Sequence, residues 1–139
     1  MRVMVLVKGD PDTEQGQLPD EGLVDRMTAF NEELVKAGVM LAGDGLYPSS
    51  KAARVRFDGA RRTVIDGPFS ESKELVAGYW LWQVRSLDEA IEWLKKAPFE
   101  TGDVEIRPIF EQEDFLAEYD SPELRERADR VKAAVADRP

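Results

Sequence analysis

The segment 77–84 constrains the fold of this chain more than any other part. It contains the residues Ala-Gly-Tyr-Trp-Leu-Trp-Gln-Val, which favour a β-strand because aromatic and β-branched side chains suit a pleated sheet. Both alternating faces are apolar or aromatic, so a sheet containing this strand must be covered on both sides. Alternation places Tyr79 on the face opposite Trp80 and Trp82, and we expect both tryptophans to lie in the core.

The remaining pattern predicts an α+β domain with a mainly antiparallel sheet. Further strands are expected at 2–8, from 39 to 46, at 54–57 and 63–65 around the Gly-containing turn 58–60, and at 104–110. An amphipathic helix is expected from Asp20 to the glycine at Gly38, and a second begins at Ser86 with a capping box to Glu89 and ends at Pro98. The polar segment 9–19 is expected to be a loop, either a lid or disordered.

This element order resembles a duplicated split βαβ unit, in which both helices lie on one side of the sheet. The apolar residues on the other face, on strands 3–7 and 78–84, therefore need a second cover. A second copy of the chain is the simplest cover, so we expect a homodimer.

We divide the chain into a domain at 1–110 and a C-terminal extension at 111–139. In the extension, Ser121 and Pro122 predict the start of a helix. Its apolar positions form one narrow stripe, and two acid–base pairs spaced four residues apart favour an exposed helix. The stripe comprises Leu124, Ala128, Val131 and Val135, and the pairs are Glu123 with Arg127 and Glu126 with Arg130.

Composition excludes several classes of function. The net charge of -9 and pI near 4.6 argue against binding to nucleic acid or to anionic membranes. The chain has no cysteine and no histidine, which removes thiolate and imidazole groups as nucleophiles, bases or metal ligands. No apolar run has membrane-spanning length, and we expect a cytoplasmic protein.

The segment 64–74 is the strongest candidate for a site. Gly67 and Pro68 force a turn after the hairpin, which holds the carboxylate of Asp66 at the end of a strand. Asp66 is a candidate general base or ligand acceptor, and Lys73 could lower its pKa or bind an anionic substrate. The alternative is that Asp66 caps its own turn and Lys73 is a surface partner.

Four further residues are candidate ligand-binding groups: Asp44, Glu71, Tyr79 and Arg107. Asp44 lies between two glycines and could pair with Asp66, although a bulged strand is the favoured explanation of those glycines. Tyr79 could offer its hydroxyl in an apolar pocket, and Arg107 could bind a carboxylate in the cleft, although a structural ion pair, with Glu105 of a second copy across the dimer, is favoured.

A metal bound by Asp44, Asp66 and Glu71 would have to be a hard cation that prefers oxygen ligands. The spacing of these acids does not match an EF-hand loop. We therefore expect neither a metal nor a cofactor.

The segment Val-Ile-Asp-Gly-Pro-Phe-Ser-Glu-Ser-Lys-Glu at 64–74 resembles the signature of the YCII-related, DGPF-motif family. The resemblance extends over nearly the whole chain, tail included, through the segments 31–39, 41–46, 78–82, 105–108 and 110–115. It implies a ferredoxin-like monomer that pairs its sheet face to face with a second copy, as a dimeric α+β barrel with clefts near the interface.

What the resemblance implies about function is less specific, because the family is largely uncharacterised. In the wider family, a histidine in the first helix and an aspartate in an Asp-Pro-aromatic segment are proposed to be catalytic. This chain has no histidine, and the comparable segment is Ala97-Pro98-Phe99, so neither group carries over. Members of the DGPF branch are also associated with alternative sigma factors.

Two functional hypotheses follow from these observations. The first is a homodimer with an inter-subunit cleft that binds a small anionic or aromatic metabolite or performs cofactor-free acid–base chemistry on it, with Asp66 and Lys73 as catalytic groups. The alternative is a regulatory or protein-interaction module that uses the C-terminal helix and the dimer surface. A purely structural dimer is a third possibility. The sequence leaves open whether the protein is an enzyme.

Overall fold

The computed structural model describes residues 1–71 and 74–139 and divides into two compact units, Met1–Pro108 and Ile109–Pro139. The elements of the first unit, including the short 3-10 helix η1, are β1 (Arg2–Lys8), α1 (Pro11–Glu14), α2 (Glu21–Lys36), β2 (Met40–Gly45), η1 (Ser49–Lys51), β3 (Ala53–Asp58), β4 (Arg61–Asp66), β5 (Val76–Gln83), α3 (Leu87–Leu94) and β6 (Val104–Pro108).

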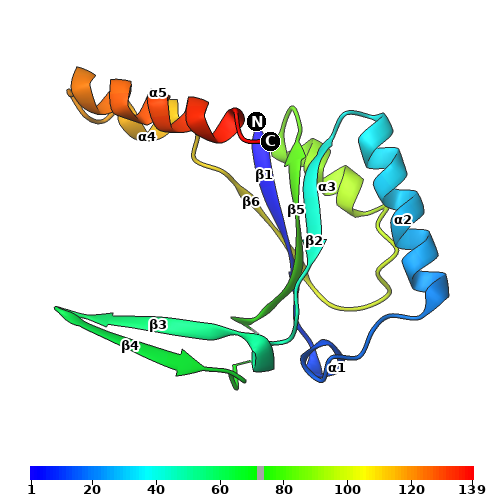
Figure 1. Ribbon diagram of the computed structural model, residues 1–139. Helices are drawn as coiled ribbons and strands as arrows, with labels where there is room; N and C mark the ends of the chain where they lie inside the picture. Colours follow the sequence, from blue (N-terminus) through cyan, green and yellow to red (C-terminus); the bar gives the residue numbers. More distant parts are fainter. Residues whose placement is uncertain (72–73) are drawn as a thin grey trace. The chain divides into compact units, whose positions relative to one another are not determined.

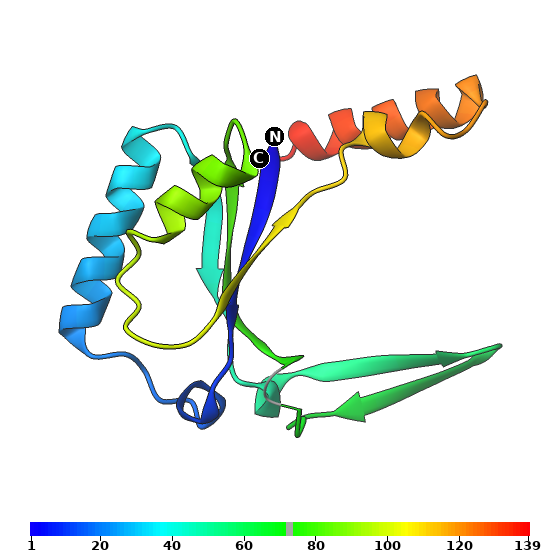
Figure 2. The same cartoon turned by 180° about the vertical axis from the view of Figure 1, so that it is seen from behind.

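The first unit contains a four-stranded antiparallel sheet in the order β2-β5-β1-β6, with α2 and α3 on the same side (Figures 1 and 2). This is the strand order of a ferredoxin-like fold, and it confirms the predicted α+β class. Segment 77–84 becomes β5, and β5 lies in the interior of the sheet between β2 and β1. One sheet face is therefore covered by helices of the same unit.

The core lies between this sheet face and the helices. Trp80 and Trp82 are buried, as predicted, and they pair in register with Val5 and Val3. Phe30 of α2 contacts the Trp80 ring edge-on at 5.8 Å between centroids. Burying side chains of this size contributes roughly 1.5–3 kcal/mol each to stability. The indole N–H of Trp80 donates to Asn31 at 2.9 Å, whereas that of Trp82 has no partner among the described residues.

Helix α2 begins and ends where its sequence signals predict. Asp20 is the N-cap, and its carboxylate accepts a hydrogen bond from the backbone N–H of Leu23 at 2.7 Å. Gly38 follows the C-cap with a φ of 74°, a left-handed conformation that suits glycine. The apolar stripe of the helix includes Phe30 and Leu34, and both side chains are buried.

The position of the bulge in β2 corrects a prediction. We expected the glycines around Asp44 to mark a bulge, but the register shifts between Met40 and Ala42, and Asp44 pairs regularly with Tyr79. Gly43 has a different role, because a Cβ on this residue would lie 2.7 Å from Cδ1 of Trp80 and 2.8 Å from Cε of Met40. Packing against the buried indole therefore explains this glycine.

The predicted hairpin forms as a separate two-stranded sheet of β3 and β4. Gly59 has a φ of 60° in the turn, as a tight hairpin connection requires. The hairpin extends away from the four-stranded sheet, on the side opposite α2 and α3 (Figures 1 and 2). Most of its side chains are exposed.

Two other local predictions were wrong. Part of the supposed loop 9–19 forms the short helix α1, because Asp10 caps it and Pro11 occupies its first turn. The last strand ends at Pro108 and does not continue to Phe110.

The second unit contains α4 (Gln112–Leu116) and α5 (Pro122–Ala136). Helix α5 begins as predicted, with Ser121 as its N-cap. The predicted pair of Glu126 and Arg130 forms an ion pair at 3.3 Å. Helix α4 was not predicted. Arg125 links the two helices by donating to the carbonyls of Leu116 and Tyr119. Among the described residues, no helix has the length and apolar character needed to cross a membrane.

Replacing Gly43 by alanine is expected to destabilise the first unit by about 1–3 kcal/mol, because the new methyl group overlaps Trp80 and Met40. Gly45→Ala is the matched control in the same strand, since its Cβ meets no atom within 4 Å. Urea unfolding monitored by tryptophan fluorescence measures both changes. Equal midpoints for the two variants would contradict the packing role of Gly43.

Candidate functional site

The sheet face opposite α2 and α3 carries a row of functional side chains, and we call this surface the open face. Strand register places Asp44 beside Tyr79, Tyr79 beside Leu6, and Leu6 beside Glu105. The next row contains Leu81, Met4 and Arg107, with Ala42 at its end. Three of the four predicted ligand-binding residues, Asp44, Tyr79 and Arg107, therefore share this face.

Asp44 and Tyr79 form the best-defined polar contact on the open face. The hydroxyl of Tyr79 donates to Oδ2 of Asp44 at 2.9 Å. This hydrogen bond is the main reason that the pKa of Tyr79 is raised above 10.0, and the negative charge of Asp44 and partial burial act in the same direction. Tyr79 therefore stays protonated at neutral pH. The pair presents a phenol donor beside a carboxylate acceptor.

Charged groups lie at the other end of the same row. Arg107 approaches Glu105 of the same chain at 3.6 Å, and Lys8 approaches the same carboxylate at 3.8 Å. The Arg107 side chain is 69% exposed, so this pair contributes little to stability. Its guanidinium group remains accessible to an anion. The expected pairing across a dimer stays a prediction.

Asp66 lies elsewhere, as the last residue of β4 and opposite Ala53. It is exposed, and its carboxylate has no hydrogen bond or ion pair within 1–71 and 74–139. Lys73, its proposed catalytic partner, lies outside the described residues. Glu71 is also exposed, and its carboxylate accepts a hydrogen bond from Ser70 at 3.1 Å. The part of the chain that the structure describes shows no contact between Asp66 and Asp44 and no cluster of three acids placed to bind a metal.

The backbone corner after Asp66 is organised by Ser49, which the sequence analysis did not identify. Ser49 is buried, and its Oγ accepts from the backbone N–H of Phe69 at 2.9 Å. The same hydroxyl donates to the carboxylate of Glu14, which also accepts from the backbone N–H of Ser49 at 3.1 Å. Glu14 belongs to α1. The corner is therefore tied to two segments that are distant in sequence.

Two residues of the Asp-Gly-Pro-Phe motif have structural roles in this corner. A Cβ on Gly67 would lie 1.6 Å from the carbonyl oxygen of Ser49, so only glycine fits there. The ring of Phe69 lies 3.7 Å from the guanidinium carbon of Arg54, a cation–π contact. Gly67 and Phe69 therefore have packing roles, whereas the Asp66 carboxylate has no partner among the described residues.

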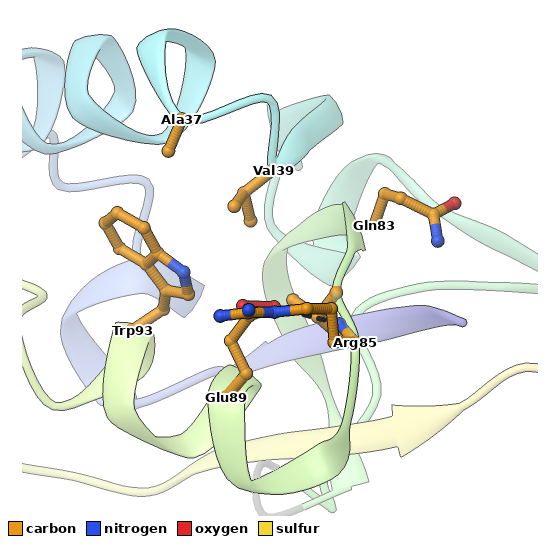
Figure 3. Close-up of a pocket in the computed structure, with 7 residues that line it drawn as sticks. Ala37, Val39, Gln83, Arg85, Glu89 and Trp93 are labelled. Carbon is orange, nitrogen blue, oxygen red and sulfur yellow. Dashed lines mark hydrogen bonds and ion pairs between the residues drawn. The ribbon is translucent and has the colours of Figure 1, made fainter.

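A hollow lies in the helix layer, away from these residues (Figure 3). Its labelled polar groups include Arg85 and Glu89, which approach each other at 3.2 Å. The backbone N–H of Arg85 donates to Glu89, and this is the main reason that the pKa of Glu89 is lowered. The hydroxyl of Ser86 accepts a hydrogen bond from the backbone N–H of Glu89, as predicted. The carboxylate of Glu89 accepts from the backbone N–H of Arg85 and not from that of Ser86, so only half of the predicted capping box forms. The carboxylate of Glu89 is thus occupied by Arg85 at the start of α3. We therefore favour the open face, and not this hollow, as the candidate site.

Comparisons with known proteins identify sequence relatives of this chain. A family model described as the YCII-related domain matches residues 1–113. An uncharacterised protein from Rhizobium meliloti (strain 1021), R00369, is 36% identical over 93 residues, which cover 65% of this chain and 75% of that protein.

The comparison with solved structures includes 5-chloro-2-hydroxyhydroquinone dehydrochlorinase (TftG) from Burkholderia phenoliruptrix AC1100, in complex with 2,5-dihydroxybenzoquinone. It is 15% identical, with a TM-score of 0.46, and the match covers 81% of this chain and 97% of that one. Similarity at this level transfers neither a ligand nor a reaction.

The family model covers the complete first unit, and the Rhizobium relative supports the same assignment at the level of sequence. The chain belongs to the YCII-related family.

Proposed function

We propose that this protein is a homodimer in which two open faces meet and enclose a site for a small anionic or aromatic metabolite. The observation that carries the proposal is the Tyr79–Asp44 hydrogen bond of 2.9 Å, which lies in one row with Leu6 and Glu105 on the sheet face opposite α2 and α3. An acid–base pair beside apolar side chains is a typical arrangement for a small-molecule site.

The apolar side chains of the open face support the proposed dimer. Met4, Leu6 and Leu81 lie side by side on β1 and β5, and each remains partly exposed in the single chain. Covering them with the same surface of a second copy removes apolar area from water in both chains. The second copy also brings its own Asp44 and Tyr79 to the interface.

The chemistry of such a site would be cofactor-free. Tyr79 can donate a hydrogen bond or a proton to an oxygen of the ligand, while Asp44 accepts one. Arg107 can bind a carboxylate or another anionic group, and Met4 and Leu6 can contact an aromatic ring. Asp66 with Lys73 remains our proposal for a second acid–base pair. Whether the site only binds or also catalyses depends on the ligand.

The regulatory alternative rests on the second unit. Val131 and Val135 of α5 are 65% and 63% exposed. They belong to the apolar stripe of this helix, against which a partner helix could pack. A truncation that removes residues 120–139 separates the two hypotheses. Ligand binding on the open face should survive it, whereas a regulatory contact through α5 should not.

The wild-type chain is expected to sediment as a dimer, and Leu6→Lys should raise the dissociation constant at least about tenfold, because it places a charge in an apolar contact. The side chain of Leu6 points away from the tryptophan core, so circular dichroism should show an intact fold. Glu32→Lys, on the exposed side of α2, is the control. A monomeric wild type would contradict the dimer.

Binding of benzoate and 4-hydroxybenzoate, measured by calorimetry, tests the site. Tyr79→Phe should weaken 4-hydroxybenzoate about tenfold or more through the lost hydrogen bond, and Arg107→Gln should weaken both probes. Asp66→Asn distinguishes the open face from the corner. If only Asp66→Asn abolishes binding, the site lies at the corner. If no variant alters the binding of either probe, the proposed ligand class is wrong.

Asp44→Asn should lower the pKa of Tyr79, because it removes the negative charge and replaces the carboxylate acceptor by a weaker neutral amide. Since the folded pKa of Tyr79 is raised, its contribution to stability is present below pH 10.0 and is lost as the pH rises through the folded value. Phenolate absorbance titration measures the change, with Tyr79→Phe identifying the signal. An unshifted titration in Asp44→Asn would contradict the hydrogen bond.

A further inference from the structure

The β3–β4 hairpin, which we call the arm, exposes an apolar face. Val55, Phe57 and Val64 are 51%, 69% and 66% exposed. Val55 pairs with Val64 across the two strands, and Phe57 lies two residues further along β3, so all three side chains share one face. A two-stranded hairpin is marginally stable by itself in water, and three large exposed apolar residues make a covering surface necessary.

The arm is also cationic within an acidic protein. Arg54, Arg56, Arg61 and Arg62 lie on its two short strands, and Asp58 and Asp66 are its acidic residues. The whole chain has a net charge of -9, so the remainder of the chain is more acidic than the total indicates. The surface that best matches the charge of the arm is therefore the rest of this same protein.

The direction of the arm identifies how a second copy reaches it. Figures 1 and 2 show the arm extending from the four-stranded sheet on the side opposite α2 and α3, which is the side of the open face. A second copy that covers the open face must come next to the arm. A nucleic acid is the less suitable occupant, because the net charge of the chain would repel it.

We propose that the arm of each chain packs its Val55–Phe57–Val64 face against a second copy. Arg62, which pairs with Phe57 on this face, then contacts acidic side chains of that copy. This inference rests on the proposed dimer and extends it. The open face supplies the central contact, and the two arms hold the subunits together at its borders. One partner then covers both apolar surfaces of the first unit.

Site-specific cross-linking tests the arm directly, because the chain has no cysteine and any introduced thiol is unique. Ala60→Cys, at the exposed tip of the hairpin, is labelled with a maleimide benzophenone in dimers mixed from unlabelled and ¹⁵N-labelled chains. Mass spectrometry should find cross-links between the two isotopic forms. Glu32→Cys on α2 is the control and should give none. Cross-links within one chain only, or none from Ala60→Cys, would overturn the proposal.

Charge reversal tests the electrostatic part. Arg62→Glu, on the same face as Phe57, should raise the dimer dissociation constant about tenfold or more at low salt, because like charges then face each other. Arg26→Glu on α2 makes the same change in net charge and should have little effect. Equal effects of the two variants, or duplex DNA binding that only the arm variant loses, would overturn the proposal.

The experiments separate this inference from the dimer itself. A monomeric wild type would overturn both proposals. A wild-type dimer that Leu6→Lys dissociates, but that resists the arm variant and forms no cross-link from the arm, would overturn this inference and leave the open-face dimer intact.

Discussion

The packing of Trp80 and Trp82 against α2 determines the orientation of the central strand, and much of the first unit depends on it. Once these two indoles are buried, the alternation of β5 directs Tyr79 and Leu81 to the opposite face. Strand register then aligns Tyr79 with functional groups from three other strands. The position of the candidate site is therefore a consequence of the core, because a slip of one residue would exchange the two faces.

The Asp-Gly-Pro-Phe motif was the strongest candidate site in the sequence, but two of its residues have structural roles in the folded chain. Gly67 fits against the carbonyl of Ser49, and the backbone N–H of Phe69 bonds the Ser49 hydroxyl. These contacts attach the base of the hairpin to α1 through Glu14. The corner thus positions the arm, whereas the carboxylate that accepts from Tyr79 is that of Asp44, on another strand and another surface.

The open face and the arm pose the same physical problem, since both expose apolar side chains on the same side of the sheet. A single partner could cover both surfaces, and a second copy is always present at the same concentration. Such an assembly would enclose the Tyr79–Asp44 pair in a setting with less water, where hydrogen bonds to a ligand are stronger. In this proposal, covering the apolar surfaces and forming the site therefore depend on the same contact.

The sequence by itself determined the elements whose signals are local. The caps of α2, the turn at Gly59 and the alternation of β5 depend on residues a few positions apart, and all formed as predicted. Tertiary structure decided the rest. The bulge position, the role of Gly43 and the Glu14–Ser49 contact arise between segments brought together only by folding, and Ser49 lies 35 residues from Glu14. Local patterns carry no information about such contacts, because these depend on side-chain volume and distance in space.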